Sequence, residues 1–290
     1  YLIGCYLLFA ATLIMGSRTH GAINWITIAG VSVQPAEITK IVLVFLLAAF
    51  YGGDEKYRRI KYAEAILMFV VYSFIGLLFL QRDLGTAVIF FGVFAGLQYI
   101  YSEDRRLIWA NLGLAAAGGI SGYLIFDHVK VRVTTWLNPW PHINDKGYQI
   151  TQSLFAISEG GFFGTGLGRG NPSFIPLSYN DFIFSAISEE MGIFTGIGII
   201  MLFMLLVYRG FKIALRQDNQ FFRIVALGIS LVFGIQSFII IGGVIKVIPL
   251  TGLTLPFISY GGSSVVTSFI ALGILQGASE KRGKAGVGNE

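Results

Sequence analysis

Three carboxylates lie close together at the start of a long apolar run: Asp181, Glu189 and Glu190. Burying a carboxylate beside hydrocarbon is costly, so such groups usually face a cavity and serve a function. At ~100° per residue on a helix, Asp181 and Glu189 share one broad face, whereas Glu190 points away. Asp181 could act as a general base, or it could cap the following helix by accepting its backbone N–H groups. The sequence leaves both roles open.

Several cationic, aromatic and hydroxyl side chains also allow both a functional and a structural interpretation. Lys130 and Arg132 open a long polar segment; they could hold a phosphate group or extend toward lipid headgroups. Trp25 could anchor the chain at a membrane surface or present its face to a sugar. Ser263 and Ser264 begin the last apolar run, where the positive end of a helix could face an anion or small residues could allow close helix packing.

Several other kinds of site are not indicated. The three histidines are scattered, and no metal-ligand spacing is present. The glycine-rich stretch 160–170 lacks the Gly-Lys-Ser/Thr of a nucleotide-binding loop, so a flexible connection is the better interpretation. The sequence therefore predicts no metal site and no cofactor, although a divalent cation is compatible with the chemistry considered below.

The elements that must position these residues are membrane helices. The chain has 290 residues, of which 54% are hydrophobic and 13% charged, and its mean hydropathy is +0.71; a soluble domain carries roughly 25% charged residues. The net charge of +5 lies in short clusters, so nucleic-acid binding is not expected. Runs of about 20 apolar residues cross a bilayer, and they predict an all-α polytopic membrane domain over 1–290 with spans near 1–16, 36–52, 63–81, 84–101, 107–126, 186–207, 224–248 and 261–277.

The distribution of Lys and Arg predicts the orientation of these spans. Basic residues are dense at 54–61, 102–106, 208–223 and in the C-terminal tail, and the positive-inside rule places such segments in the cytoplasm. The segment 127–181 then faces outside, with an amphipathic helix near 148–158, and so does the segment 17–35. A loop as long as 127–181 is usually functional. We therefore expect the function on the outer face.

A series of short motifs runs in order along the chain. The motifs are Gly21-Ala22-Ile23-Asn24-Trp25-Ile26, Gln34-Pro35-Ala36-Glu37, Asp83-Leu84-Gly85-Thr86, Asn138-Pro139-Trp140, Gly147-Tyr148-Gln149 with Gln152-Ser153-Leu154, Gly166-Leu167-Gly168, Asp181-Phe182-Ile183-Phe184 with Glu189-Glu190, and Gly252-Leu253-Thr254-Leu255-Pro256 with Ser259-Tyr260-Gly261-Gly262-Ser263-Ser264. Together they resemble the SEDS family, the FtsW, RodA and SpoVE proteins of bacteria.

The resemblance implies a fold of about ten membrane helices. We expect about eight of them in this chain, each of ~20 residues, and we expect two N-terminal helices of the family fold to be missing. It implies a multi-pass protein of the bacterial cytoplasmic membrane with a cytoplasmic C-terminus. It also implies a peptidoglycan glycosyltransferase that polymerises lipid II and works with a class B penicillin-binding protein, a transpeptidase. Asp181 matches the family's essential outer-loop aspartate. The resemblance and the outer position together nominate as substrate-binding residues Lys130, Arg132, Trp25, Glu37, Asp83, Glu189, Glu190, Lys246, Ser263 and Ser264.

Some positions depart from the family pattern. Asn24 stands where members often have Arg, Arg82 where they often have Pro, and Asn180 where a Thr usually precedes the aspartate. Thr251 replaces a Lys that some members carry before the Gly-Leu-Thr motif, which leaves Lys246 as the nearest base.

The expected reaction is a single displacement with inversion, in which Asp181 takes a proton from the acceptor hydroxyl and Lys130, Arg132 or a divalent ion stabilises the leaving pyrophosphate. Two other classes of function compete with this interpretation. A transporter or flippase of lipid-linked precursors is disfavoured because the charges lie on the outer side rather than at the midplane. A non-catalytic scaffold for a transpeptidase stays open, since Asp181 could be only a helix cap.

Overall fold

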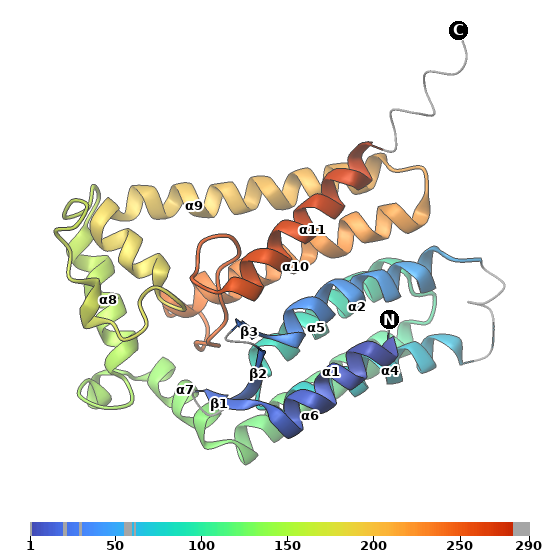
Figure 1. Ribbon diagram of the computed structural model, residues 1–290, viewed down its shortest axis with the longest axis horizontal. Helices are drawn as coiled ribbons and strands as arrows, with labels where there is room; N and C mark the ends of the chain where they lie inside the picture. The colour runs from blue at the N-terminus through green and yellow to red at the C-terminus, as the bar shows by residue number, and fades with distance from the viewer. Residues whose placement is uncertain (1, 20–21, 29–30, 55–59, 61, 281–290) are drawn as a thin grey trace, which may run out of the picture. The chain divides into compact units, whose positions relative to one another are not determined.

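A computed structural model describes residues 2–19, 22–28, 31–54, 60 and 62–280 (Figure 1). Within this part of the chain, seven helices are long and apolar enough to cross a membrane, which confirms the predicted all-α polytopic class. They are α2 (Pro35–Gly52), α4 (Ala63–Leu80), α5 (Leu84–Tyr101), α6 (Arg105–Ile125), α9 (Ile183–Arg216), α10 (Gln220–Val244) and α11 (Gly262–Glu280). The run predicted at 1–16 is the shorter helix α1 (Leu2–Met15).

The segment between α1 and α2 contains three short strands that the sequence does not predict. β1 (Ser17–Thr19), β2 (Ala22–Ile28) and β3 (Val31–Val33) form an antiparallel sheet in the order β1-β2-β3. Trp25 lies on β2, and its Cα faces that of Ser17 across an irregular register. Isoleucine, valine, threonine and tryptophan favour a pleated surface. The strands are only three to seven residues long, however, and so they do not stand out among apolar runs of about 20 residues.

The chain divides into two compact units. The first comprises Tyr1–Ser121, Leu206–Ile235 and Gly262–Glu290, and the second comprises Gly122–Leu205 and Gln236–Gly261. The helices α6, α9 and α10 contribute to both units. The expectation of a single membrane domain over 1–290 stays a prediction. The basic residues of segment 54–61 that support the predicted orientation, and those of the tail from Lys281 onward, lie outside the described residues.

In the first unit, α2 packs against α1, α4, α5 and α11. Its buried face carries Leu43, Val44 and Leu47, which are almost fully excluded from the surface, as are Phe90 and Phe94 on α5. Between membrane helices, association depends on close van der Waals packing rather than on removal of apolar area from water. The interlocked side chains therefore hold these helices together.

The second unit contains most of the predicted outer segment. It is built from α7 (Asp127–Leu137), η1 (Trp140–His142), α8 (Tyr148–Gly160), η2 (Pro172–Phe174) and the adjoining parts of α9 and α10. The helix predicted near 148–158 corresponds to α8. The sequence does not predict helix α7, because the polar residues of 127–137 resemble the opening of a loop. The span predicted at 186–207 begins earlier and ends later, as α9, and is interrupted at Gly192, whose φ of 79° and ψ of 168° are not helical.

Candidate functional site

Asp181 and Arg132 border the same small space in the second unit, although they are far apart in sequence. A methyl group added to Gly252 would lie 2.9 Å from Arg132 Nη2 and 3.4 Å from Asp181 Oδ2. Arg132 Nη1 also donates a hydrogen bond of 2.8 Å to the Thr251 carbonyl. A carboxylate, a guanidinium and the 251–252 backbone, from three segments of the chain, therefore meet at one place.

The backbone at Gly252 makes this close approach possible. Its φ is +75°, a conformation that residues with a Cβ rarely adopt. The Arg132 guanidinium also lies too close for a Cβ, which would just touch Asp181 Oδ2. The Gly-Leu-Thr motif that supported the family resemblance thus acquires a structural role, because its glycine lets the main chain lie directly against the charged groups.

The turn before α9 presents Asp181. The carbonyl of Phe182 accepts the N–H groups of Ser185 and Ala186, so Phe182 rather than Asp181 occupies the N-cap position of α9. The side chain of Phe182 is 1% exposed, so its burial anchors the turn. Ser259 Oγ donates 2.7 Å to the Asn180 carbonyl. The residue before the carboxylate and the residue after it are therefore both held.

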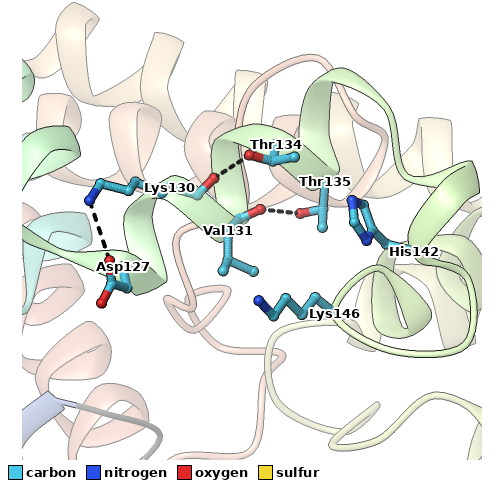
Figure 2. A pocket seen from close by; sticks show the side chains of 7 residues that line it. All are labelled: Asp127, Lys130, Val131, Thr134, Thr135, His142 and Lys146. Carbon is cyan, nitrogen blue, oxygen red and sulfur yellow. Dashed lines mark hydrogen bonds and ion pairs between the residues drawn. The ribbon is translucent and has the colours of Figure 1, made fainter.

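Lys130 and Arg132 are on the same helix but engage different surroundings. Residues two positions apart on an α-helix point in directions that differ by about 200° around the helix axis. Arg132 reaches Thr251, whereas Lys130 Nζ lies 3.3 Å from Asp127 Oδ1 and borders a pocket on the other side of α7 (Figure 2). The structure therefore separates two cations that the sequence suggested could act together.

Glu189 and Glu190 hold the glycine-rich loop to α9. Glu189 is 2% exposed, and its Oε1 accepts the N–H of Asn171 at 2.6 Å. Its other oxygen, Oε2, is buried without a hydrogen-bond partner among the described residues. The main-chain carbonyls of Glu189 and Glu190 accept the N–H groups of Thr165 and Gly166. These contacts give both glutamates a structural part in closing the loop.

Lys246 lies in the turn after α10. Its φ is +63°, and its carbonyl accepts the indole N–H of Trp136 at 3.2 Å. This bond joins the end of α7 to the segment that leads to Gly252. Lys246 thus contributes through its main chain to the arrangement around Arg132.

Five of the predicted substrate-binding residues belong to the first unit. Asp83, 8% exposed, caps α5 by accepting the N–H of Thr86 at 3.1 Å. It also accepts the side-chain amides of Asn24 at 3.0 Å and Gln34 at 2.9 Å. Asn24, which departs from the family pattern, therefore satisfies part of a buried carboxylate. Trp25 follows it and is half-buried on β2.

Glu37, Ser263 and Ser264 are the other predicted substrate-binding residues of the first unit. Glu37, 3% exposed, pairs with Lys40 at 2.9 Å and accepts the Thr267 hydroxyl at 3.0 Å. Ser264 is 3% exposed, and the hydroxyl of Ser263 is buried without a hydrogen-bond partner in the described part of the chain. Both Glu37 and Asp83 are therefore hydrogen-bonded within the first unit, and their contact with a substrate stays a prediction.

Sequence reasoning missed several residues that the structure adds to the candidate sites. Gly252 and Thr251 carry the backbone beside Asp181. His142 and Lys146 line the pocket with Lys130. A signal for Gly252 was present in its motif, but nothing in the sequence places Lys146 near Lys130. Among the described residues, no three His, Cys, Asp or Glu side chains gather as a metal site would require.

The helices and this polar site together define a multi-pass membrane protein. The profile of the FtsW/RodA/SpoVE family, described as cell cycle proteins, matches residues 1–284. The chain belongs to this family, as the motifs predicted, and it is a multi-pass bacterial membrane protein.

Individual relatives are similar over most of the chain. The peptidoglycan glycosyltransferase RodA of Mycobacterium tuberculosis is 39% identical over 274 residues, which cover 89% of this chain and 58% of that protein. The stage V sporulation protein E of Bacillus subtilis is 36% identical over 280 residues, or 93% of this chain and 75% of that protein. The chain thus spans little more than half the length of the mycobacterial relative.

A solved structure shares the fold. It is described as the structural coordination of polymerization and crosslinking by a peptidoglycan synthase complex. It superposes with a TM-score of 0.79 at 26% identity, covering 98% of this chain and 80% of the matched chain. The likeness extends over both units of the chain.

Proposed function

We propose that this chain carries the polymerising site of a peptidoglycan glycosyltransferase, which joins lipid II units at the outer face of the membrane with Asp181 as the general base. The observation that carries the proposal is the meeting of Asp181 with Arg132 beside Gly252. The relative from Mycobacterium tuberculosis is named a peptidoglycan glycosyltransferase, which supports the reaction class. Asp181 is half-buried, so it can be reached from outside the protein.

The site offers what the displacement requires. A carboxylate takes the proton of the acceptor sugar hydroxyl as the oxygen attacks the anomeric carbon, and the bond to the pyrophosphate breaks with its electron pair staying on the leaving group. Proton transfer to a positioned base contributes typically 10²–10⁴ in rate. The leaving group gains negative charge, and the Arg132 guanidinium is a fixed cation that can stabilise it. A single base of this kind gives inversion at the anomeric carbon.

Asp181 occupies the position before the N-cap of α9, which weakens the alternative in which it serves only as the cap. Asp181 is half-buried and lies with the Arg132 guanidinium beside Gly252. Glu189, in contrast, is 2% exposed and accepts the Asn171 N–H. Asp181 is therefore our choice for the base, with Arg132 as the cation at the same site.

The first prediction concerns Asp181→Asn in the full-length protein. Asparagine keeps the shape but cannot accept the proton, so glycan polymerisation from purified lipid II should fall by about 10²–10⁴, with little change in melting temperature. Glu159→Gln removes an exposed carboxylate from α8 of the same unit and should leave polymerisation unchanged. Normal polymerisation by Asp181→Asn would show that Asp181 is not the base.

We also propose that the partner is a class B penicillin-binding protein. This proposal rests on the family membership and on the similar solved complex, which combines polymerization with crosslinking. Co-purification from native membranes, in the same experiment, should retain this transpeptidase with both wild type and Asp181→Asn. If the partner is retained while neither protein polymerises lipid II, the non-catalytic scaffold becomes the better interpretation. If no penicillin-binding protein is recovered with either, the proposed partnership is wrong.

A further inference from the structure

A second charged site lies on α7, on a different side of the helix from Arg132. A cavity of about 440 Å³ is lined by Asp127, Lys130, Val131, Thr134, His142 and Lys146, among others. Figure 2 shows these side chains around one opening between α7 and the segment that follows η1. The volume falls within the range of small-molecule sites, and all its lining residues belong to the second unit.

The lining favours an anion. Lys146 is exposed and makes no hydrogen bond or ion pair with any residue that the structure describes. Lys130 is paired with Asp127 at 3.3 Å, but their side chains are 43% and 94% exposed. Such a surface pair contributes only about 0–1 kcal/mol. The Lys130 ammonium can therefore turn to a bound anion at little cost.

The hydroxyls of the pocket do not compete for this role. Thr134 Oγ1 donates to the Lys130 carbonyl at 2.8 Å, and Thr135 Oγ1 donates to the Val131 carbonyl at 2.8 Å. Both hydroxyl protons are thus used within α7. The donors available for a ligand are the ammonium groups of Lys130 and Lys146, with His142, which lies 3.5 Å from Asp145, at the rim.

The position of the pocket along the chain suggests the source of the anion. Helix α6, a candidate span, ends at Ile125, and α7 begins at Asp127. Lys130 therefore follows the end of the span by only about 7 Å of helix. The polar headgroup layer extends about 5–8 Å beyond the hydrocarbon on each side. Trp140, 54% exposed, adds an aromatic side chain of the kind found at this depth.

We propose that this pocket binds the phosphate of a membrane lipid headgroup through Lys130 and Lys146. Two sources share this chemistry: the pyrophosphate of a polyprenyl-linked sugar and the phosphate of an anionic phospholipid. Only the first rests on the proposed glycosyltransferase function, for which the pocket would hold the pyrophosphate that stays on its lipid-linked substrate, while Arg132 faces the pyrophosphate that leaves. The site differs from that of Asp181, which Arg132 borders from another face of the helix.

The test measures binding of two probes, a polyprenyl pyrophosphate and phosphatidylglycerol, to the full-length protein by native mass spectrometry. Lys146→Glu should weaken binding of one probe about tenfold, the effect of losing one charge-assisted contact, and Lys130→Gln should weaken binding of the same probe. Lys212→Glu reverses a charge on α9 outside the pocket and should change neither. If the two pocket variants lose binding of the polyprenyl pyrophosphate alone, the ligand is the substrate headgroup. If they lose binding of phosphatidylglycerol, the ligand comes from the bilayer.

Binding of both probes unchanged in Lys146→Glu and Lys130→Gln would overturn the proposal. Failure of the proposed function is recognised separately, because the binding measurement requires no turnover. Asp181→Asn should bind the same probe as wild type even though it does not polymerise lipid II. If Asp181→Asn polymerises normally, the general base has been misassigned, while the result for Lys146 still decides whether the pocket binds a phosphate.

Discussion

At the scale of single residues, the candidate site depends on an atom that is missing. Gly252 has no Cβ, and the Arg132 guanidinium lies where a Cβ would collide with it, with Asp181 Oδ2 just within contact distance. A side chain here would strain the backbone, because φ is +75°, and would push the guanidinium aside. Small displacements of reacting groups can cost 10²-fold in rate. The glycine is therefore as important for the geometry as the charges themselves.

We predict that Gly252→Ala lowers lipid II polymerisation by about 10²-fold, since the added Cβ moves the Arg132 guanidinium from its place beside Asp181. The matched control is Gly168→Ala. Gly168 has a φ of +71° but nothing within 4 Å of an added Cβ, so it carries similar backbone strain without the collision. Both variants should lose about 1–2 kcal/mol of stability, measured from melting curves, and only Gly252→Ala should lose activity. Equal activity in the two variants would contradict the proposed geometry.

At the scale of elements, the interruption of α9 at Gly192 joins this helix to the glycine-rich loop. Around the break, Ile193 N–H donates to the Gly161 carbonyl at 2.9 Å, and Phe194 N–H donates to the Phe162 carbonyl at 3.3 Å. The backbone groups freed by the interrupted helix are thus satisfied by the loop, as they must be in a membrane. The loop is consequently a part of the packed structure and not merely a connection.

We predict that Gly192→Ala destabilises the protein by at least about 1–3 kcal/mol, the cost of one strained non-glycine residue. An added Cβ would also lie under 3.0 Å from the Phe162 carbonyl oxygen and the Gly164 nitrogen. Gly198→Ala, on the same helix with nothing within 4 Å, should be neutral or slightly stabilising. Thermal unfolding of both variants in the same detergent provides the comparison, and similar melting temperatures would argue against the helix break.

At the scale of the whole molecule, the predicted orientation determines which face carries the chemistry. Cysteines introduced at Ser173 and Asp218, in a Cys5→Ala background, should distinguish the two sides in intact cells. Ser173 should react with a membrane-impermeant thiol reagent and Asp218 should not, since 127–181 is predicted outside and 208–223 inside. Both positions are exposed, whereas neighbouring Gln217 is only 5% exposed and would be a poor probe. The reverse labelling pattern would invert the proposed topology.

The sequence by itself determined the fold class, the positions of most spans and the family. Runs of apolar residues are a local property, and the bilayer requires each run to be helical because its backbone must be satisfied internally. The motifs are also local, which is why the sequence alone nominates Asp181 and Arg132 as site residues. The strands at 17–33 and helix α7 were not predicted, because their short, mixed patterns of polar and apolar residues do not differ from those of a loop.

Only the tertiary structure decided which of these residues act together. It placed Arg132 with Asp181 at Gly252, put Lys130 and Lys146 in the lining of one pocket, and gave Asp83 and Glu37 hydrogen-bond partners in the interior. Contacts between residues such as 132 and 251 depend on how separate segments pack. The number of residues between two positions in the sequence does not predict their distance in space. The chemistry of each side chain was therefore available from the sequence, whereas its neighbours were not.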